Sequence, residues 1–224
     1  VASMFLGKKI KSKELEEFVN FVLKLLVDHG PYVSGAVNTI ITSRAGRDLV
    51  SSLASGILTV GPRFGGAINQ AAESFLEGVE SGKSASDFVE EFASQKKYIA
   101  GIGHRKYRVD MPDPRVGEIL KHTEGLDAKF TKFAREVEKV TVAKKGNLIL
   151  NVDGAIAAVM LDILAEKEGF TPEELRELAE IEFFNALFVA SRSIGFISHF
   201  LDQKRLDEGI FRLEEEHVAD ASRE

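Results

Sequence analysis

The chain has 224 residues, of which 44% are hydrophobic and 29% are charged, and it contains no cysteine. This composition predicts a folded protein with a sizeable core, excludes disulfides and thiolate ligands, and fits a protein of the cytoplasm. The formal net charge of −6 provides no global basic field, so we expect no nucleic-acid partner.

The start of the chain lacks the apolar core of a signal peptide. No stretch approaches the roughly 18 to 20 consecutive apolar residues that cross a membrane, so we expect no membrane partner. The valine at position 1 is consistent with a chain taken from a longer protein.

Helical spacing of apolar residues recurs along the whole chain. Leu15, Phe18, Val22 and Leu25 follow one another at intervals of three or four residues, which predicts an amphipathic helix over 13–28. Further helices are predicted over 34–45, 47–59, 66–79, 86–97, 114–122, 126–143, 156–168, 171–180 and 181–206. Alternating runs typical of strands are nearly absent, so the predicted fold class is all-α.

Two helix starts carry capping signals. Ser84 or Ser86 can cap the helix over 86–97, and Thr171-Pro172-Glu173-Glu174 combines a cap, a proline and an acidic first turn.

His104 is the histidine that the sequence singles out. Gly101 and Gly103 allow the backbone to bend, so that the imidazole can project from a tight turn into a cavity. The same glycines hint at a dinucleotide-binding loop, but the third glycine is replaced by Arg108, and we reject that interpretation.

The remaining histidines are interpreted more plainly. His122 and His217 lie in polar surroundings, and His199 is interpreted as a core or surface residue of the longest helix. No histidine pair has metal-ligand spacing and cysteine is absent, so we expect no metal site.

Asp153 lies between an apolar run and an apolar helix. Its carboxylate should therefore stand at a helix N-terminus, either as an ordinary N-cap or as an acid or base of raised pKa. Arg192 lies inside an apolar helical run, where a guanidinium requires an anionic partner. Short basic pairs near His104 and Asp153 suit a phosphate-bearing ligand.

Six segments, taken in order, resemble the citrate synthase superfamily over nearly the whole chain, and most closely its citryl-CoA lyase modules. They are 28–31 (DHGP), 45–52 (AGRDLVSS), 61–67 (GPRFGGA), 101–105 (GIGHR), 147–154 (NLILNVDG) and 191–199 (SRSIGFISH), running on to 201–205.

The resemblance implies one citrate synthase-like domain over 1–224, with a small lobe at about 67–150 inserted in a large helical core. It implies cleavage of citryl-CoA to acetyl-CoA and oxaloacetate by a homotetramer. Coenzyme A then enters as part of the substrate. ATP and Mg²⁺ would act only through a fused or associated citryl-CoA synthetase module.

The resemblance also assigns roles to residues. His29, His104 and Asp153 are implied as catalytic, and Lys97, Arg105, Lys144 and Lys145 as contacts of coenzyme A. Phe64, Arg115, Arg192 and Arg212 are implied as substrate contacts. A continuous helix would carry Arg212 away from its own pocket, which favours a neighbouring subunit's pocket.

Two departures from full citrate synthases bear on the choice of reaction. The chain lacks their first third, and Phe64 stands where they place an enol-binding histidine, so His29 is our candidate to share that role. Both departures favour a lyase over a short citrate synthase that runs the condensation. A free-standing citryl-CoA lyase and a helical tetramerisation module without chemistry also fit this sequence.

Overall fold

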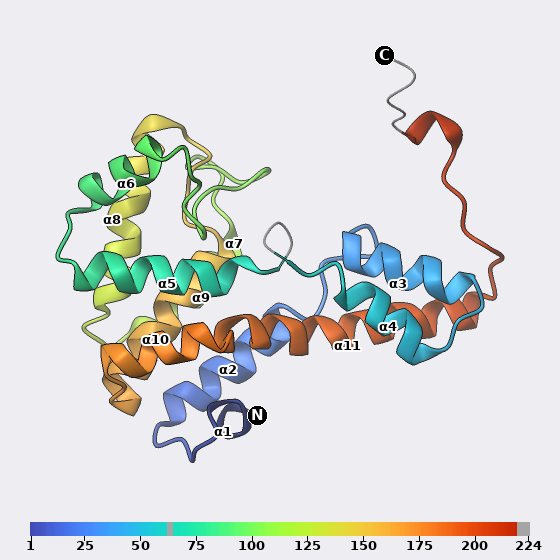
Figure 1. The fold of residues 1–224 in the computed structure, drawn as a ribbon, viewed down its shortest axis with the longest axis horizontal. Coiled ribbons are helices and arrows are strands. Elements are labelled where there is room, and N and C mark those ends of the chain that lie inside the picture. Colours follow the sequence, from blue (N-terminus) through green and yellow to red (C-terminus); the bar gives the residue numbers. More distant parts are fainter. Residues whose placement is uncertain (62–64, 219–224) are drawn as a thin grey trace. The chain divides into compact units, whose positions relative to one another are not determined.

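The computed structural model describes residues 1–61 and 65–218, so the predicted contact Phe64 lies outside the described residues. These residues form helices joined by loops, and within them only isolated bridge pairs occur and no strand (Figure 1), which confirms the all-α class. The longer helices are α2 (Lys13–Leu25), α3 (Ser34–Arg44), α4 (Leu49–Ile57), α5 (Ala67–Glu80), α6 (Ala85–Ser94), α8 (Lys129–Lys144), α9 (Val152–Ile163), α10 (Pro172–Glu180) and α11 (Phe183–Leu206). Shorter ones are α1 (Ala2–Leu6), α7 (Pro114–Leu120), η1 (Lys121–Thr123), the π-helix η2 (Leu164–Glu168) and η3 (Glu215–His217).

The capping signals are confirmed. Thr171 Oγ1 accepts a hydrogen bond from Glu174 N at 3.3 Å, and the Glu174 carboxylate accepts one from Thr171 N at 2.8 Å. Of the two candidate serines, Ser84 caps α6 by accepting from Asp87 N at 3.1 Å. Each cap satisfies amide groups that the first turn of a helix cannot pair internally.

The chain divides into two compact units. Unit 1 comprises Val1–Leu26 and Gly61–Ser191, and unit 2 comprises Val27–Val60 and Arg192–Glu224. Helix α11 begins in unit 1 and ends in unit 2. The predicted lobe at 67–150 lies wholly within unit 1, and its autonomy stays a prediction.

Helix α9 forms the centre of unit 1 and packs against α2, α5, α7 and α8. Every residue of α9 is buried except Asp153, which is half-buried. The predicted start at residue 156 was wrong: α9 begins four residues earlier, at Val152, because the Asn151 side chain caps it by accepting from Gly154 N at 3.1 Å.

In unit 2, α3 and α4 pack on each other and lie beside the C-terminal half of α11 (Figure 1). Glycine permits this packing, since a Cβ on Gly35 would stand 2.2 Å from the buried Phe196 ring of α11. A Cβ on Gly56 would stand 2.2 Å from Thr39 Oγ1. The small residues of α3 and α4 thus make room for one aromatic ring.

Two sequence-based expectations about single elements were wrong. His122 does not lie in polar surroundings, because its ring packs 5.0 Å from the Phe18 ring and 4.7 Å from the Phe21 ring, measured between centroids. This burial lowers the pKa of His122, and the charge of Glu17 opposes the effect.

Second, α11 is long and apolar enough, by length and composition alone, to cross a membrane. Its most apolar window is 44% buried inside the protein, and a single helix of this kind is weak evidence for a span.

Candidate active site

Two loops of unit 1 pair as a short antiparallel ladder. Gly103 N donates to Ile149 O at 2.7 Å, and His104 N donates to Asn147 O at 3.0 Å. Ile102 and Leu150 form an antiparallel bridge, flanked by the Gly103–Ile149 bond and by the bond from Asn151 N to Gly101 O. The segments 101–104 and 147–151 are thereby fixed to each other, directly before α9 begins.

Glycines allow the first loop to lie on the N-terminus of α9. Gly101 has a φ of +83°, and a Cβ there would stand 2.6 Å from Gly154 Cα. The reverse holds for Gly154, whose Cβ would stand 2.4 Å from Gly101 O. Asn151 joins the loop to the helix, because its N donates to Gly101 O at 2.9 Å and its Nδ2 to Gly103 O at 3.0 Å. The structure therefore holds the loop that ends in His104 against the helix turn that carries Asp153.

The His104 ring is oriented by its own loop. Its Nδ1 accepts hydrogen bonds from Lys106 N and Tyr107 N, each at 3.0 Å, and the Tyr107 ring lies 4.8 Å from it between centroids. A neutral imidazole whose Nδ1 accepts must carry its hydrogen on Nε2. His104 thus presents Nε2–H as a donor.

Asp153 is the second residue of α9. The interpretation of Asp153 as an ordinary N-cap is wrong, because Asn151 holds that position. A carboxylate in the first turn is stabilised by the partial positive charge of the helix N-terminus. Asp153 is the one half-buried residue of this otherwise buried helix, so it is the only side chain of α9 that remains partly accessible.

Arg115 is held by a carboxylate that sequence reasoning missed. Asp113, whose side chain is fully buried, caps α7 and accepts from Arg115 Nη2 at 2.6 Å and from Arg115 Nε at 3.0 Å. Burial alone would raise the pKa of Asp113, but the hydrogen bonds and charge of Arg115 outweigh it, so the pKa is lowered. The signal was the Asp-Pro step before a helix, a common capping pattern.

Electrostatic coupling groups these residues of unit 1. The pKa of Arg115 is raised, mainly by its hydrogen bonds to Asp113 against the opposing effect of burial, with smaller contributions from the charges of Tyr107 and Asp153. The charge that His104 would carry if protonated lowers the pKa of Asp113 further, so these two side chains lie within electrostatic range of each other. The structure therefore brings together three predicted residues, His104, Asp153 and Arg115.

Unit 2 holds three further predicted residues. His29 lies in the loop after α2, and Arg192, only 5% exposed, lies on α11. Arg212 lies past the long helix, whose predicted end at residue 206 is confirmed. Helix α11 ends at Leu206, and the following chain turns onto Arg44, whose Nε donates to Gly209 O at 2.7 Å. Arg212 itself is exposed.

The four predicted contacts of coenzyme A are all exposed on unit 1. Arg105 directly follows His104, and Lys145 lies two residues before Asn147, so these two residues flank the ladder. Lys144 Nζ lies 3.4 Å from a Glu90 carboxylate oxygen. Lys97 lines a separate cavity of about 250 Å³.

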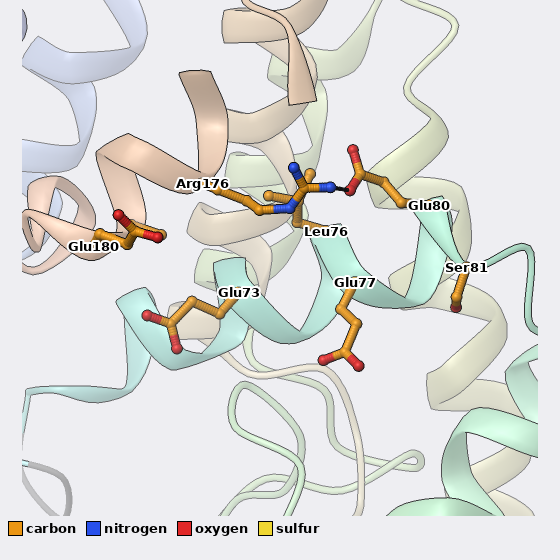
Figure 2. Close-up of a pocket in the computed structure, with 8 residues that line it drawn as sticks. Glu73, Leu76, Glu77, Glu80, Ser81, Arg176 and Glu180 are labelled. Atoms are coloured by element: carbon orange, nitrogen blue, oxygen red, sulfur yellow. Dashed lines mark hydrogen bonds and ion pairs between the residues drawn. The ribbon is translucent and has the colours of Figure 1, made fainter. Parts of the chain in front are cut away.

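A larger cavity of about 520 Å³ lies between α5 and α10, away from the predicted residues (Figure 2). Glu73, Glu77, Glu80 and Glu180 line it, and Arg176 pairs with Glu80. Burial, helped by the charges of neighbouring glutamates, raises the pKa of Glu73. A pocket with this excess of carboxylates disfavours an anionic ligand. Among the described residues, no three His, Asp or Glu side chains gather to hold a metal ion.

Comparisons with known proteins agree on one family. The family model "Citrate synthase, C-terminal domain" matches residues 1–214. A probable ATP-citrate synthase of Caenorhabditis elegans is 52% identical over 202 residues, which cover 88% of this chain and 18% of that protein.

Two solved structures are similar throughout this chain. ATP citrate lyase from Methanothrix soehngenii, in complex with citrate and coenzyme A, has a TM-score of 0.89 and 43% identity, over 93% of this chain and 34% of that chain. Citryl-CoA lyase from Hydrogenobacter thermophilus has a TM-score of 0.79 and 29% identity, over 98% of this chain and 81% of that chain. The chain therefore spans only a minor part of the larger relatives.

Proposed function

The chain belongs to the citrate synthase family, and from that premise we propose that it cleaves citryl-CoA into acetyl-CoA and oxaloacetate. The observation that carries the proposal is the ladder that holds the His104 loop against the first turn of α9, where Asp153 lies. The names of the similar proteins, ATP citrate lyase and citryl-CoA lyase, support the choice of substrate.

The reaction breaks one carbon–carbon bond and moves one proton. The hydroxyl-bearing carbon of the citryl group becomes the ketone of oxaloacetate as its hydroxyl proton passes to solvent water, from which Asp153 is protonated again after each turnover. The electron pair of the broken bond stays on the neighbouring methylene, which becomes the enolate of acetyl-CoA. That carbon takes up one proton to become methyl, so no net proton is gained or lost.

His104 acts on the oxygen. Its Nδ1 accepts two backbone hydrogen bonds, so the neutral ring offers Nε2–H to the hydroxyl oxygen as negative charge develops there. The backbone amides of Lys106 and Tyr107 disfavour a second proton at Nδ1 and keep the ring a neutral donor.

Asp153 acts on the carbon. In its protonated form the carboxyl delivers the proton that converts the enolate carbon to methyl, and in the reverse direction the carboxylate removes it. The half-buried end of α9 gives this group access to a ligand while the rest of the helix fixes its position. His29 shares the stabilisation of the thioester oxygen by a directed hydrogen bond.

Arginines hold the substrate carboxylates. Asp113 engages Nε and Nη2 of Arg115, which leaves Nη1 to bind a carboxylate. The buried Arg192 binds another, and Arg212 reaches a neighbouring subunit's pocket. Lys97, Arg105, Lys144 and Lys145 contact the phosphates of coenzyme A, and Phe64 contacts the substrate.

The proposal extends to the assembly. The protein works as a cytoplasmic homotetramer, and ATP and Mg²⁺ are used by a fused or associated citryl-CoA synthetase module. This chain covers 18% of the ATP-citrate synthase of Caenorhabditis elegans, which supports a role as one module among several.

The test is direct cleavage of citryl-CoA by the purified protein, followed through oxaloacetate formation. We expect His104→Ala to lower the rate by about two to four powers of ten, as loss of a positioned acid or base does. His217→Ala, which removes an exposed histidine, is the matched control. Condensation of acetyl-CoA with oxaloacetate to citrate faster than cleavage would favour the short citrate synthase. If a folded oligomer catalyses neither reaction, the helical tetramerisation module without chemistry is the function that remains.

A further inference from the structure

Helix α11 lies directly on the chain segment that leads to His29. Gly195 faces the Val27 carbonyl, and a Cβ on that glycine would stand 2.1 Å from Val27 O. No side chain other than hydrogen fits this contact. Arg192 lies three residues before Gly195 and His199 four residues after it, so all three share one face of the helix.

His199 uses this proximity to reach Asp28. Its Nε2 lies 2.9 Å from Asp28 Oδ1, with the His199 side chain 12% exposed and the Asp28 side chain 43% exposed. The second oxygen of Asp28, Oδ2, accepts from Gly30 N at 3.1 Å. Asp28 is therefore bonded on both sides, and His29 lies between the two bonded residues.

The turn itself depends on glycine. Gly30 has a φ of +92°, in the left-handed region, and a Cβ there would stand 2.5 Å from the Tyr32 ring. The His29 ring lies 6.3 Å from the Tyr32 ring between centroids. A glycine can adopt many backbone conformations. The hydrogen bond from Gly30 N to the Asp28 carboxylate holds the backbone in the left-handed one.

Asp28 is the charged acceptor of the pair. Burial alone would raise the pKa of Asp28, but the hydrogen bond to His199 and those from the Gly30 and His29 amides outweigh it, so the pKa is lowered. Asp28 is thus a carboxylate near neutral pH and can only accept. His199 must then donate from Nε2, whether the ring is neutral or protonated.

We propose that His199 is a positioning residue which, through Asp28, fixes the turn that carries His29 against the face of α11 that carries Arg192. This inference rests on the proposed function, because that function gives His29 and Arg192 their roles. It assigns no contact between His199 and substrate. From the sequence alone, His199 was interpreted as a core or surface residue with no functional role.

The first test does not need activity. We expect His199→Leu to speed amide hydrogen exchange at Gly30 by roughly ten-fold or more, because the bond that holds its acceptor is lost. His199→Gln retains an N–H donor at a similar distance and should stay within about three-fold of wild type. His217→Leu, which removes another histidine of unit 2, should leave Gly30 exchange unchanged.

The second test is kinetic. For citryl-CoA cleavage we expect His199→Leu to lower kcat by roughly ten- to hundred-fold, as displacement of a catalytic group by about 1 Å does. His199→Gln should restore most of this loss. Asp28→Asn, which keeps the shape but not the charge, should lie between the two and covers the case in which His199→Leu does not fold.

The outcomes separate the two proposals. Wild-type protein that does not cleave citryl-CoA contradicts the proposed function, while Gly30 exchange still tests the Asp28–His199 link. Unchanged Gly30 exchange in His199→Leu, or equal loss of kcat in His199→Leu and His199→Gln, overturns the positioning role.

Discussion

Asp153→Asn removes the ionisable group at the N-terminus of α9 while keeping its size. We expect citryl-CoA cleavage to fall by about two to four powers of ten with unchanged substrate binding, since an amide cannot transfer the proton. Single-turnover kinetics of oxaloacetate formation measures this. Asp87→Asn, which alters an exposed acid in the first turn of α6, is the matched control and should keep wild-type rates. A near wild-type rate in Asp153→Asn would remove Asp153 from the chemistry.

Asp113→Asn should couple stability to pH. The folded-state pKa of Asp113 is lowered, so its stabilising effect is complete above the range where an unfolded aspartate titrates. That effect is lost as the pH falls through the lowered pKa. We expect a destabilisation of roughly 1–3 kcal/mol at neutral pH, from a buried carboxylate that has lost its charge beside Arg115.

Urea denaturation at several pH values checks this expectation. The gap between wild type and Asp113→Asn should narrow on acidification, whereas Asp110→Asn, at an exposed aspartate, should show little gap at any pH. A gap that is constant with pH would contradict the role of the charge.

Sequence could mark the candidate site residues but not the residues that hold them in place. His104 and Asp153 stand next to glycines, and Arg192 stands in an apolar run, so their local context marks them. The partner of His199 lies 171 positions earlier in the chain, and no local pattern indicates it. His122 was misjudged for the same reason, because the rings of Phe18 and Phe21 approach it only through folding.

At the scale of elements, the N-terminus of α9 packs directly on the loop that carries His104, at Gly154 and Gly101. We expect Gly154→Ala to destabilise unit 1 by about 1–3 kcal/mol, because the added Cβ would overlap Gly101 O and force the loop away. Cleavage activity should fall with it, since His104 moves relative to Asp153.

Gly117→Ala is a sharp control for this change. Gly117 also lies inside a helix, α7, but a Cβ there meets no atom within 4 Å. Alanine should therefore stabilise the protein by about 0.5–1 kcal/mol through helix propensity alone. Denaturation midpoints of the two variants that shift in the same direction would contradict the close approach at Gly154.

Helix positions could largely be predicted from local signals, and the exceptions have identifiable causes. The predicted starts at residues 13 and 34 match α2 and α3, and at α2 the Ser12 side chain caps the first turn where the apolar spacing begins. Helix α8 begins three residues later than predicted, at Lys129. Its first amides are satisfied from another helix, since Asp162 of α9 accepts from Phe130 N at 2.8 Å and Thr131 N at 2.9 Å. Such a cap is invisible in the local sequence.

At the scale of the assembly, Arg212 tests the shared-site proposal. We expect Arg212→Ala and Asp153→Asn each to be nearly inactive alone, and mixed oligomers of the two to regain activity. One pocket of each hybrid dimer would combine an intact Asp153 with the neighbour's intact Arg212, so about half of the pockets should work.

Citryl-CoA cleavage after subunit exchange measures this, with hybrids counted by native mass spectrometry. A mixture of Arg212→Ala with Arg115→Ala offers a contrast, because it asks whether Arg115 also complements across subunits. Confirmed hybrids no more active than the parent variants would show that Arg212 does not act in trans.

The division of the chain into two units, each built from two separated segments, sets an order for folding during synthesis. Residues 27–60 leave the ribosome before 61–191, yet the segment that completes their unit begins only at Arg192. At the usual rate of translation, α3 and α4 emerge on the order of ten seconds before the ring of Phe196 can cover Gly35. Unit 1 is complete once Ser191 has emerged, so it can fold first and give nascent α11 a fixed end from which to grow. The nascent chain therefore exposes the small-residue face of α3 and α4 until the C-terminal half of α11 has emerged.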